Sequence, residues 1–167
     1  MNGDDVRRGV DRISRRMACE REALCALDAQ SGDGDLGVSM NDGFAAVQNW
    51  LGQTAENDLG RLLLGMSGAF NEAAPSSLGT ILSLGMAGMA RVLKGRTQCT
   101  PGELAAAMRR GLEVMMERGG ARPGEKTVLD ALSPAVEALE RHAAEGLAQA
   151  LAAAAGAAGE ARKIHAA

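Results

Sequence analysis

Aromatic residues are almost absent from this chain. Only Phe44, Trp50 and Phe70 occur among its 167 residues, and there is no tyrosine. Valine, isoleucine and threonine are also sparse, and strands are built largely from β-branched and aromatic side chains. Alanine, leucine, methionine, glutamate and arginine abound instead, and these residues favour helices. The composition therefore predicts an all-α protein.

Long apolar runs are lacking as well. No window reaches the roughly 18 uninterrupted apolar residues of a membrane span, and the N-terminal MNGDDVRRGV has no apolar core of a secretion signal. We therefore expect a soluble, cytoplasmic protein with no membrane partner. Cys19, Cys25 and Cys99 are odd in number and show no CxxC spacing, which disfavours a disulfide framework and a cysteine zinc site. We interpret them as reduced, small apolar residues.

A strong charge of one sign is missing too. The net charge is -3, and acidic and basic residues alternate along the chain. A nucleic-acid binder is expected to carry a broad basic face, so we expect no nucleic-acid partner.

With 46% apolar residues and no evident linker or repeat, residues 1–167 are predicted to form one domain.

Apolar residues recur at alternating steps of three and four from Val6 to Leu27, which is the stripe of an amphipathic helix ending at Asp28. Thr100 to Glu103 is a helix start, because Thr can cap, Pro suits the first position and Glu can complete a capping box. The remaining helices are expected over residues 38–51, 59–71, 77–93, 101–118, from 127 onward, and within an alanine-rich segment from 143. Six or seven such helices predict a bundle.

The most informative segment is the loop after the first helix. It reads DAQSGDGDLG and places Asp28, Asp33 and Asp35 within eight residues. Three carboxylates that converge need a counter-charge, and magnesium prefers such hard oxygen ligands together with phosphate and water. An ordinary acidic turn is the simpler alternative, because Asp and Gly are common turn residues.

Other ligand-binding motifs are absent from the sequence. An EF-hand would need a different ligand spacing and a bidentate glutamate, and neither a Walker loop nor a G-x-G-x-x-G motif is present. His142 and His165 are too far apart in sequence to favour a histidine metal site. Arg122 and Lys126 flank a Pro-Gly pair and are candidates for a phosphate or subunit contact, although exposed basic loop residues are common.

The segment CEREALCALDAQSGDGDLGVSMNDGFAAV resembles the signature of the dihydroxyacetone kinase nucleotide-binding (L) subunit, also known as the DAK2-domain family. A second segment, MERGGARPGEKTVLDALSPAVEAL, resembles the family's R-G-x-A-x-P-G-D-K-T-x-x-D stretch. Between them, Leu78-Gly79-Thr80 is similar to the end of a third family segment. The resemblance covers nearly the whole chain.

This resemblance implies an antiparallel barrel of eight helices that binds ADP or ATP at one end. Two magnesium ions would hold the phosphates, with Asp28, Asp33 and Asp35 as metal ligands. The same matching implies further nucleotide contacts. Those near the phosphates would be Leu36, Gly37, Val38, Ser39, Ala73, Ala74, Ser76 and Ser77, and those bordering the adenine would be Gly119 and Val128.

The implied reaction transfers a phosphoryl group to dihydroxyacetone held on a separate K subunit. Because it stands without a fused K domain, the chain resembles the branch in which a phosphohistidine protein of the phosphotransferase system rephosphorylates bound ADP. Exchange of ATP, another short ketose as acceptor and a homodimer remain alternatives.

Some positions depart from the family pattern. Leu36 replaces a His or Thr, Val38-Ser39 replaces a pair that usually ends in Asn, and residues 71–77 lack the family's glycines. Family members also continue beyond the position of Ala167, so we expect a barrel shortened at its C-terminus. These departures leave open a non-catalytic regulatory or assembly relative that keeps the helical scaffold.

Overall fold

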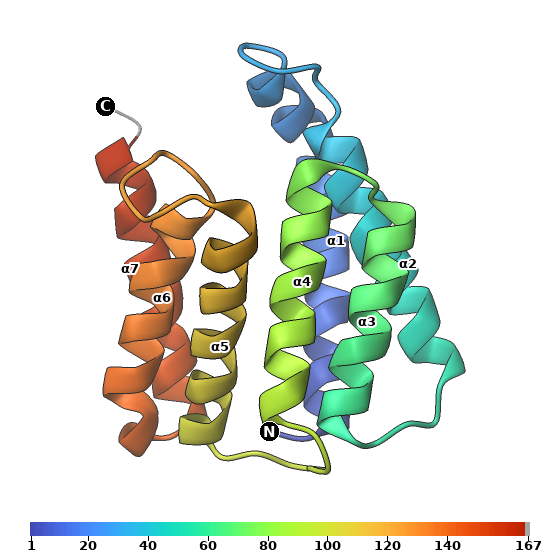
Figure 1. Ribbon diagram of the computed structural model, residues 1–167, viewed down its shortest axis with the longest axis vertical. Coiled ribbons are helices and arrows are strands. Elements are labelled where there is room, and N and C mark those ends of the chain that lie inside the picture. The colour runs from blue at the N-terminus through green and yellow to red at the C-terminus, as the bar shows by residue number, and fades with distance from the viewer. Residues whose placement is uncertain (166–167) are drawn as a thin grey trace.

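The computed structural model describes residues 1–165, with side chains through Ala161. Within that range it contains seven α-helices and one 3₁₀ turn (Figure 1). The elements are α1 (Gly3–Asp28), α2 (Leu36–Gln53), α3 (Leu59–Ala73), α4 (Ser77–Val92), α5 (Pro101–Gly119), α6 (Leu129–His142), η1 (Ala143–Glu145) and α7 (Leu147–His165). No strand occurs in these residues, so the prediction of an all-α fold is confirmed.

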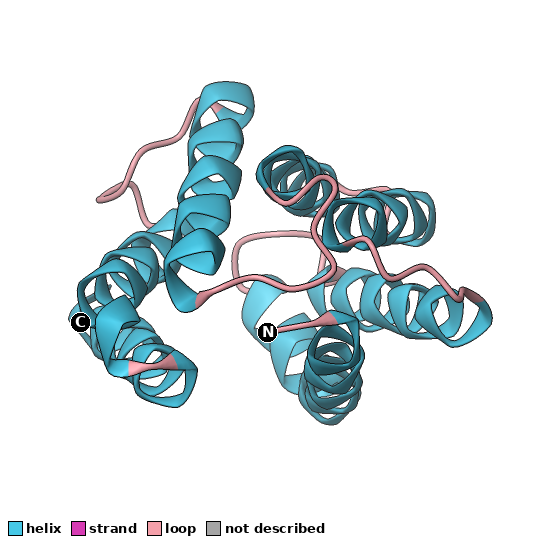
Figure 2. Cartoon of the chain, turned by 90° about the horizontal axis from the view of Figure 1, so that it is seen from below, coloured by secondary structure: helices cyan, strands magenta, loops and turns pink. Residues whose placement is uncertain are grey.

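The helices run up and down, and each packs against the next along the chain (Figures 1 and 2). As a result, the loops that follow α1, α3 and α5 all lie at the upper end of the view in Figure 1. These three loops cover residues 29–35, 74–76 and 120–128. The other connections lie at the opposite end. This alternation brings segments that are distant in sequence to one end of the bundle.

Side-chain caps define where most helices begin. Asn2 and Thr100 form capping boxes at the starts of α1 and α5, and Asp58 and Ser76 cap α3 and α4 through their side-chain oxygens. Each cap satisfies an N–H group that has no partner inside its helix. The capping box predicted at Thr100 is thus confirmed. Gly120 ends α5 in a left-handed conformation with φ +73°.

The main core lies among α1 to α4 and extends to α5, α6 and α7. Phe70 of α3 is fully buried, and its ring meets that of Phe44 edge-on, with centroids 5.0 Å apart. Gly43 makes room for this pair, because a Cβ there would overlap the Phe70 ring. The few aromatic residues are therefore concentrated at the α2–α3 contact.

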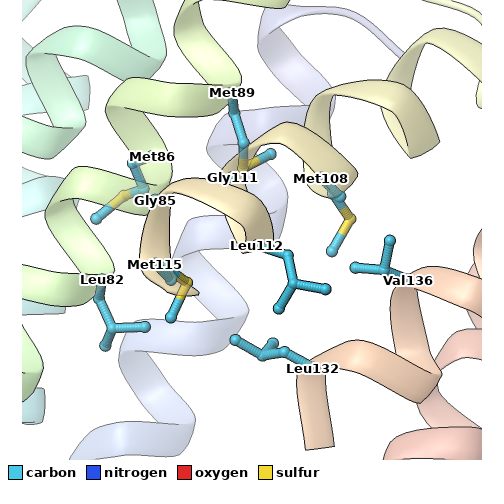
Figure 3. A pocket seen from close by; sticks show the side chains of 10 residues that line it. All are labelled: Leu82, Gly85, Met86, Met89, Met108, Gly111, Leu112, Met115, Leu132 and Val136. Carbon is cyan, nitrogen blue, oxygen red and sulfur yellow. The ribbon is translucent and has the colours of Figure 1, made fainter. Parts of the chain in front are cut away.

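A second, smaller core lies where α4, α5 and α6 meet, and beside it is an apolar pocket of about 120 Å³ that is partly open to solvent (Figure 3). Gly85 of α4 and Gly111 of α5 face each other across this contact, and a Cβ at Gly111 would lie 2.9 Å from the Gly85 carbonyl oxygen. Four methionines contribute to the pocket wall, namely Met86, Met89, Met108 and Met115. Flexible methionine side chains suit such an irregular space.

The resemblance implied eight helices, whereas residues 1–165 contain seven α-helices. The first and last of them, α1 and α7, lie on opposite sides of an apolar groove of about 440 Å³, with Val6, Val10, Leu104 and Leu147 among its lining residues.

In the described residues, no helix is both long and apolar enough to cross a membrane. Cys99 is buried as expected of a small apolar residue, but Cys19 is exposed on α1.

We predict that Phe70→Ala lowers the free energy of unfolding by about 3–5 kcal/mol, because it removes a fully buried ring and leaves a cavity. Chemical denaturation would measure the loss. Leu64→Ala is the matched control on the same helix, since Leu64 is 59% exposed and should change stability by no more than about 0.5 kcal/mol. Equal effects of the two substitutions would contradict this description of the core.

Candidate functional site

The acidic loop brings its three aspartates together. Asp28 is the last residue of α1, and Asp33 and Asp35 lie on the exposed loop that leads into α2. One carboxylate oxygen from each residue lies within 4.8 Å of those of the other two. The convergence predicted from the sequence is therefore present. Three hard oxygen donors at this spacing fit a divalent cation such as magnesium.

Asp28 also organises the loop. One of its carboxylate oxygens accepts hydrogen bonds from the backbone N–H groups of Gly34, at 2.9 Å, and Leu36, at 3.4 Å. Hydrogen bonds to an ionised acceptor are stronger than neutral ones. Gly34 itself adopts φ +80°, which favours glycine. The sequence predicts Asp28 only as a ligand and does not reveal this role, because a bond that spans six to eight residues follows no local pattern.

The start of α2 is held against α1 by a close contact at Gly37. A Cβ on Gly37 would overlap the carbonyl oxygen of Arg21 and lie 2.9 Å from the Sγ of Cys25. Only a glycine permits this approach without a shift of one helix. α2 begins at Leu36, two residues earlier than predicted, and its Asp35 makes no side-chain cap. Leu36 to Ser39 thus form the first turn of a helix, where backbone N–H groups favour anions.

The negatively charged carboxylates of the loop repel one another. The negative charge of Asp33 raises the pKa of Asp35, and desolvation, a hydrogen bond with Asp33 and the charge of Asp28 act in the same direction. A raised pKa means that the folded loop disfavours the ionised form of Asp35. A cation bound among the carboxylates would reverse this effect. The electrostatics are consistent with a metal site.

Residues 73–77 lie at the same end of the bundle as the acidic loop (Figure 1). Ala73 ends α3, and Ala74 is fully buried. Ser76 is the cap of α4, because its Oγ accepts the Gly79 N–H at 3.1 Å. Ser77 is the exposed first residue of that helix. The side chain of Ala74 is therefore turned into the core, while Ser77 remains available to solvent.

Gly119 and Val128, the residues expected to border an adenine, lie at the two ends of the loop between α5 and α6. A Cβ on Gly119 would lie 3.2 Å from Cδ1 of Ile81, and Val128 packs on the second core. This loop also lies at the upper end of Figure 1. All the residues named from the sequence as ligands therefore occupy one end of the bundle.

Other residues considered from the sequence have different surroundings. His142 pairs with Glu145, with Nδ1 and Oε1 2.8 Å apart, and the side chain of His165 lies outside the described residues. Arg122 and Lys126 are both exposed on the 120–128 loop. The carboxylate of Asp130, at the start of α6, accepts a hydrogen bond from the N–H of Gly124, a contact across six residues that no local sequence pattern indicates.

The fold and the loop define a class of protein, an antiparallel helical bundle with converging carboxylates at one end. The DAK2 domain model matches residues 30–164. This is most of the chain, and the chain therefore belongs to the DAK2 domain family.

Two relatives and one solved structure illustrate the similarity. The PEP-dependent dihydroxyacetone kinase ADP-binding subunit DhaL of Escherichia coli is 31% identical over 128 residues, which cover 77% of this chain and 61% of that protein. The triokinase/FMN cyclase of Rattus norvegicus is 35% identical over 133 residues, which cover 78% of this chain and 22% of that protein. The chain thus spans less than two thirds of either relative.

The solved structure is that of the dihydroxyacetone kinase from C. freundii in complex with AMP-PNP and Mg²⁺. It superimposes with a TM-score of 0.75 at 27% sequence identity, over 91% of this chain and 27% of that chain. This match confirms the helical fold that the sequence resemblance implied. The nucleotide and the magnesium belong to that kinase.

We predict that Gly37→Ala destabilises the protein by about 1–3 kcal/mol, because the added methyl group forces α1 and α2 apart. Thermal or chemical unfolding would measure this. Gly52→Ala, in the same helix, is the matched control: a Cβ added there would meet nothing within 4 Å, and alanine is favoured over glycine in a helix. Gly37→Ala at wild-type stability would refute the close contact.

We also predict that Mg²⁺ stabilises the protein more at neutral pH than at about pH 4, near the ordinary pKa of Asp. Because the pKa of Asp35 is raised by folding, protonation favours the folded state, and this contribution is lost as the pH rises through the folded pKa. A bound cation removes the penalty at neutral pH. Melting temperatures with and without Mg²⁺ test this, with Asp35→Asn as the control that should weaken the pH dependence.

Proposed function

We propose that this chain is the nucleotide-binding subunit of a kinase for dihydroxyacetone or another short ketose. The observation that carries the proposal is the convergence of Asp28, Asp33 and Asp35 at one end of a DAK2-family bundle. The names of the relatives and the nucleotide complex of the C. freundii enzyme support it. The reaction is transfer of a phosphoryl group from a nucleotide to a sugar hydroxyl group.

The three aspartates would hold magnesium, and we propose two ions. Two divalent cations would offset four of the roughly six negative charges of three carboxylates and a diphosphate, whereas one ion would offset only two. Magnesium bound here would neutralise the phosphate oxygens and orient them. Asp28 has a second task, because it holds the backbone of the loop through Gly34 and Leu36. The ligand cluster is thereby partly preorganised.

The remaining candidate residues divide between the two ends of the nucleotide. Residues 36–39 form the first turn of α2. The N–H of Leu36 already donates to Asp28 and that of Ser39 to the carbonyl oxygen of Asp35, so contact with the phosphates through this turn would rest on the N–H groups of Gly37 and Val38. Ser76 and Ser77, with the adjoining Ala73 and Ala74 backbone, would approach the phosphates from the start of α4. Gly119 and Val128 would border the adenine. Positioning and electrostatics of this kind supply most of the catalysis in phosphoryl transfer.

The acceptor sugar would be bound by a separate K subunit, as the resemblance to the family implies. A phosphohistidine protein is the proposed phosphoryl donor, in keeping with the PEP-dependent relative in Escherichia coli. Direct use of ATP and a homodimeric state are alternatives that the same site would permit.

A second candidate function is a non-catalytic relative with weak nucleotide binding. It is favoured by residues 73–77, where Ala74 is fully buried and the Ser76 oxygen already accepts a hydrogen bond within the α4 cap. A phosphate contact from this segment would rest mainly on Ser77 and on backbone groups. Phosphorylation of dihydroxyacetone in a mixture of this chain, a K subunit and a phosphoryl donor would eliminate this alternative.

We predict that Asp33→Asn weakens Mg²⁺-dependent ADP binding by at least about tenfold. Loss of a residue that only hydrogen-bonds to a metal ligand already weakens metal binding by about tenfold or more, and Asp33 would be a ligand itself. Isothermal titration calorimetry with ADP, in the presence of Mg²⁺ and then of a chelator, measures it. The wild-type protein should bind only with Mg²⁺.

Asp4→Asn is the matched control. Asp4 is 74% exposed near the start of α1, at the opposite end of the bundle, so this variant should bind ADP like the wild type. Equal ADP binding by the wild type and Asp33→Asn would contradict the proposed metal site.

A further inference from the structure

The loop of residues 120–128 has a defined conformation although most of it is exposed. Its backbone is left-handed at three positions, with φ +73° at Gly120, +99° at Gly124 and +57° at Lys126. Glycine adopts this region freely, but it is unfavourable for lysine. A loop that merely joined two helices would have no need of a left-handed lysine, and such conformations concentrate at functional sites.

Asp130 maintains this conformation. The residue is 9% exposed, and its two carboxylate oxygens accept separate hydrogen bonds from the backbone N–H groups of Gly124 and Thr127, the latter at 2.7 Å. These two donors lie on either side of Lys126. Hydrogen bonds to a carboxylate are among the stronger ones in proteins. The carboxylate therefore fixes the chain on both sides of the left-handed lysine.

The two ends of the loop are fixed to the second core. Ala121 and Val128 pack against the cluster around Leu112 and Met115. Val128 lies two residues before Asp130, so the carboxylate and the core together determine where Val128 is placed. The middle of the loop adds a turn of its own, because the N–H of Arg122 donates to the Glu125 side chain at 3.0 Å.

The acidic loop and the 120–128 loop lie at the same end of the bundle but belong to different helix pairs (Figure 1). The metal-binding candidates lie between α1 and α2, and the 120–128 loop lies between α5 and α6. Asp130 is thus placed to affect one part of a bound nucleotide without touching the carboxylates that would hold its phosphates.

We propose that Asp130 is a positioning residue that shapes the 120–128 loop for the nucleoside end of the nucleotide. This inference rests on the proposed function, in which Gly119 and Val128 border the base. Asp130 acts through the backbone of Gly124 and Thr127 and does not itself contact the ligand. Its loss should therefore reduce recognition of the base and leave the grip on the phosphates intact.

The test compares two ligands of the full chain by calorimetry, Mg²⁺ with ADP and Mg²⁺ with pyrophosphate, which lacks the nucleoside. Asp130→Asn replaces one acceptor oxygen with an NH₂ group that cannot accept from a backbone N–H. We expect roughly tenfold weaker ADP binding, the effect of one lost charged hydrogen bond, and unchanged pyrophosphate binding. Asp33→Asn should weaken the binding of both ligands, because Asp33 would hold the magnesium that binds the phosphates.

The two ligands distinguish failure of the inference from failure of the proposed function. A wild-type chain that binds neither ligand would overturn the proposed function, and the inference with it. A wild-type chain that binds ADP, together with an Asp130→Asn chain that binds ADP equally well, would overturn the inference alone. Equal weakening of ADP and pyrophosphate by Asp130→Asn would also overturn it, since that is the result of general destabilisation.

A second pair of variants provides the test if Asp130→Asn does not fold. Lys126→Asn and Lys126→Val both remove the exposed ammonium group, but asparagine tolerates a left-handed backbone and the β-branched valine does not. We expect Lys126→Val to bind ADP more weakly than Lys126→Asn, with equal pyrophosphate binding. Indistinguishable ADP affinities would show that the loop conformation does not serve the base.

Discussion

The repulsion among three carboxylates at the end of α1 is the constraint on which the site depends. The charges of Asp33 and Asp28 act against ionisation of Asp35, and the chain around these residues is restrained at two points. Asp28 accepts hydrogen bonds from the backbone of the loop, and the contact at Gly37 brings the first turn of α2 against α1. The three carboxylates are thereby kept close together at the exposed end of the bundle, although their charges repel one another.

Much of the fold could be predicted from residue spacing. The apolar stripe that ends at Asp28 and the capping box at Thr100 each predicted an observed boundary, because both signals are local. The start of α2 was predicted two residues late, since the N–H of Leu36 donates to Asp28, which no short-range pattern reveals. The expected eighth helix came from the resemblance, and residues 1–165 contain seven.

The candidate site could be predicted in part. Its residues occur in three separate segments, and an up-and-down bundle brings the loops after α1, α3 and α5 to one end. What the sequence could not supply was the surroundings of each side chain. Ala73 and Ala74 are the same residue type next to each other in the sequence, yet Ala74 is fully buried and Ala73 is only partly buried. The left-handed backbone of Lys126 was equally hidden, because lysine gives no signal for it and its cause, Asp130, lies four residues away.

The methionine-lined pocket between α4, α5 and α6 affects how this helix contact can adapt. The backbones of α4 and α5 approach closely at Gly85 and Gly111, which fixes their spacing. Beside this close approach, the pocket of about 120 Å³ is partly open to solvent, and unbranched methionine side chains change conformation readily. The contact therefore combines a fixed distance between two backbones with an adjustable apolar lining.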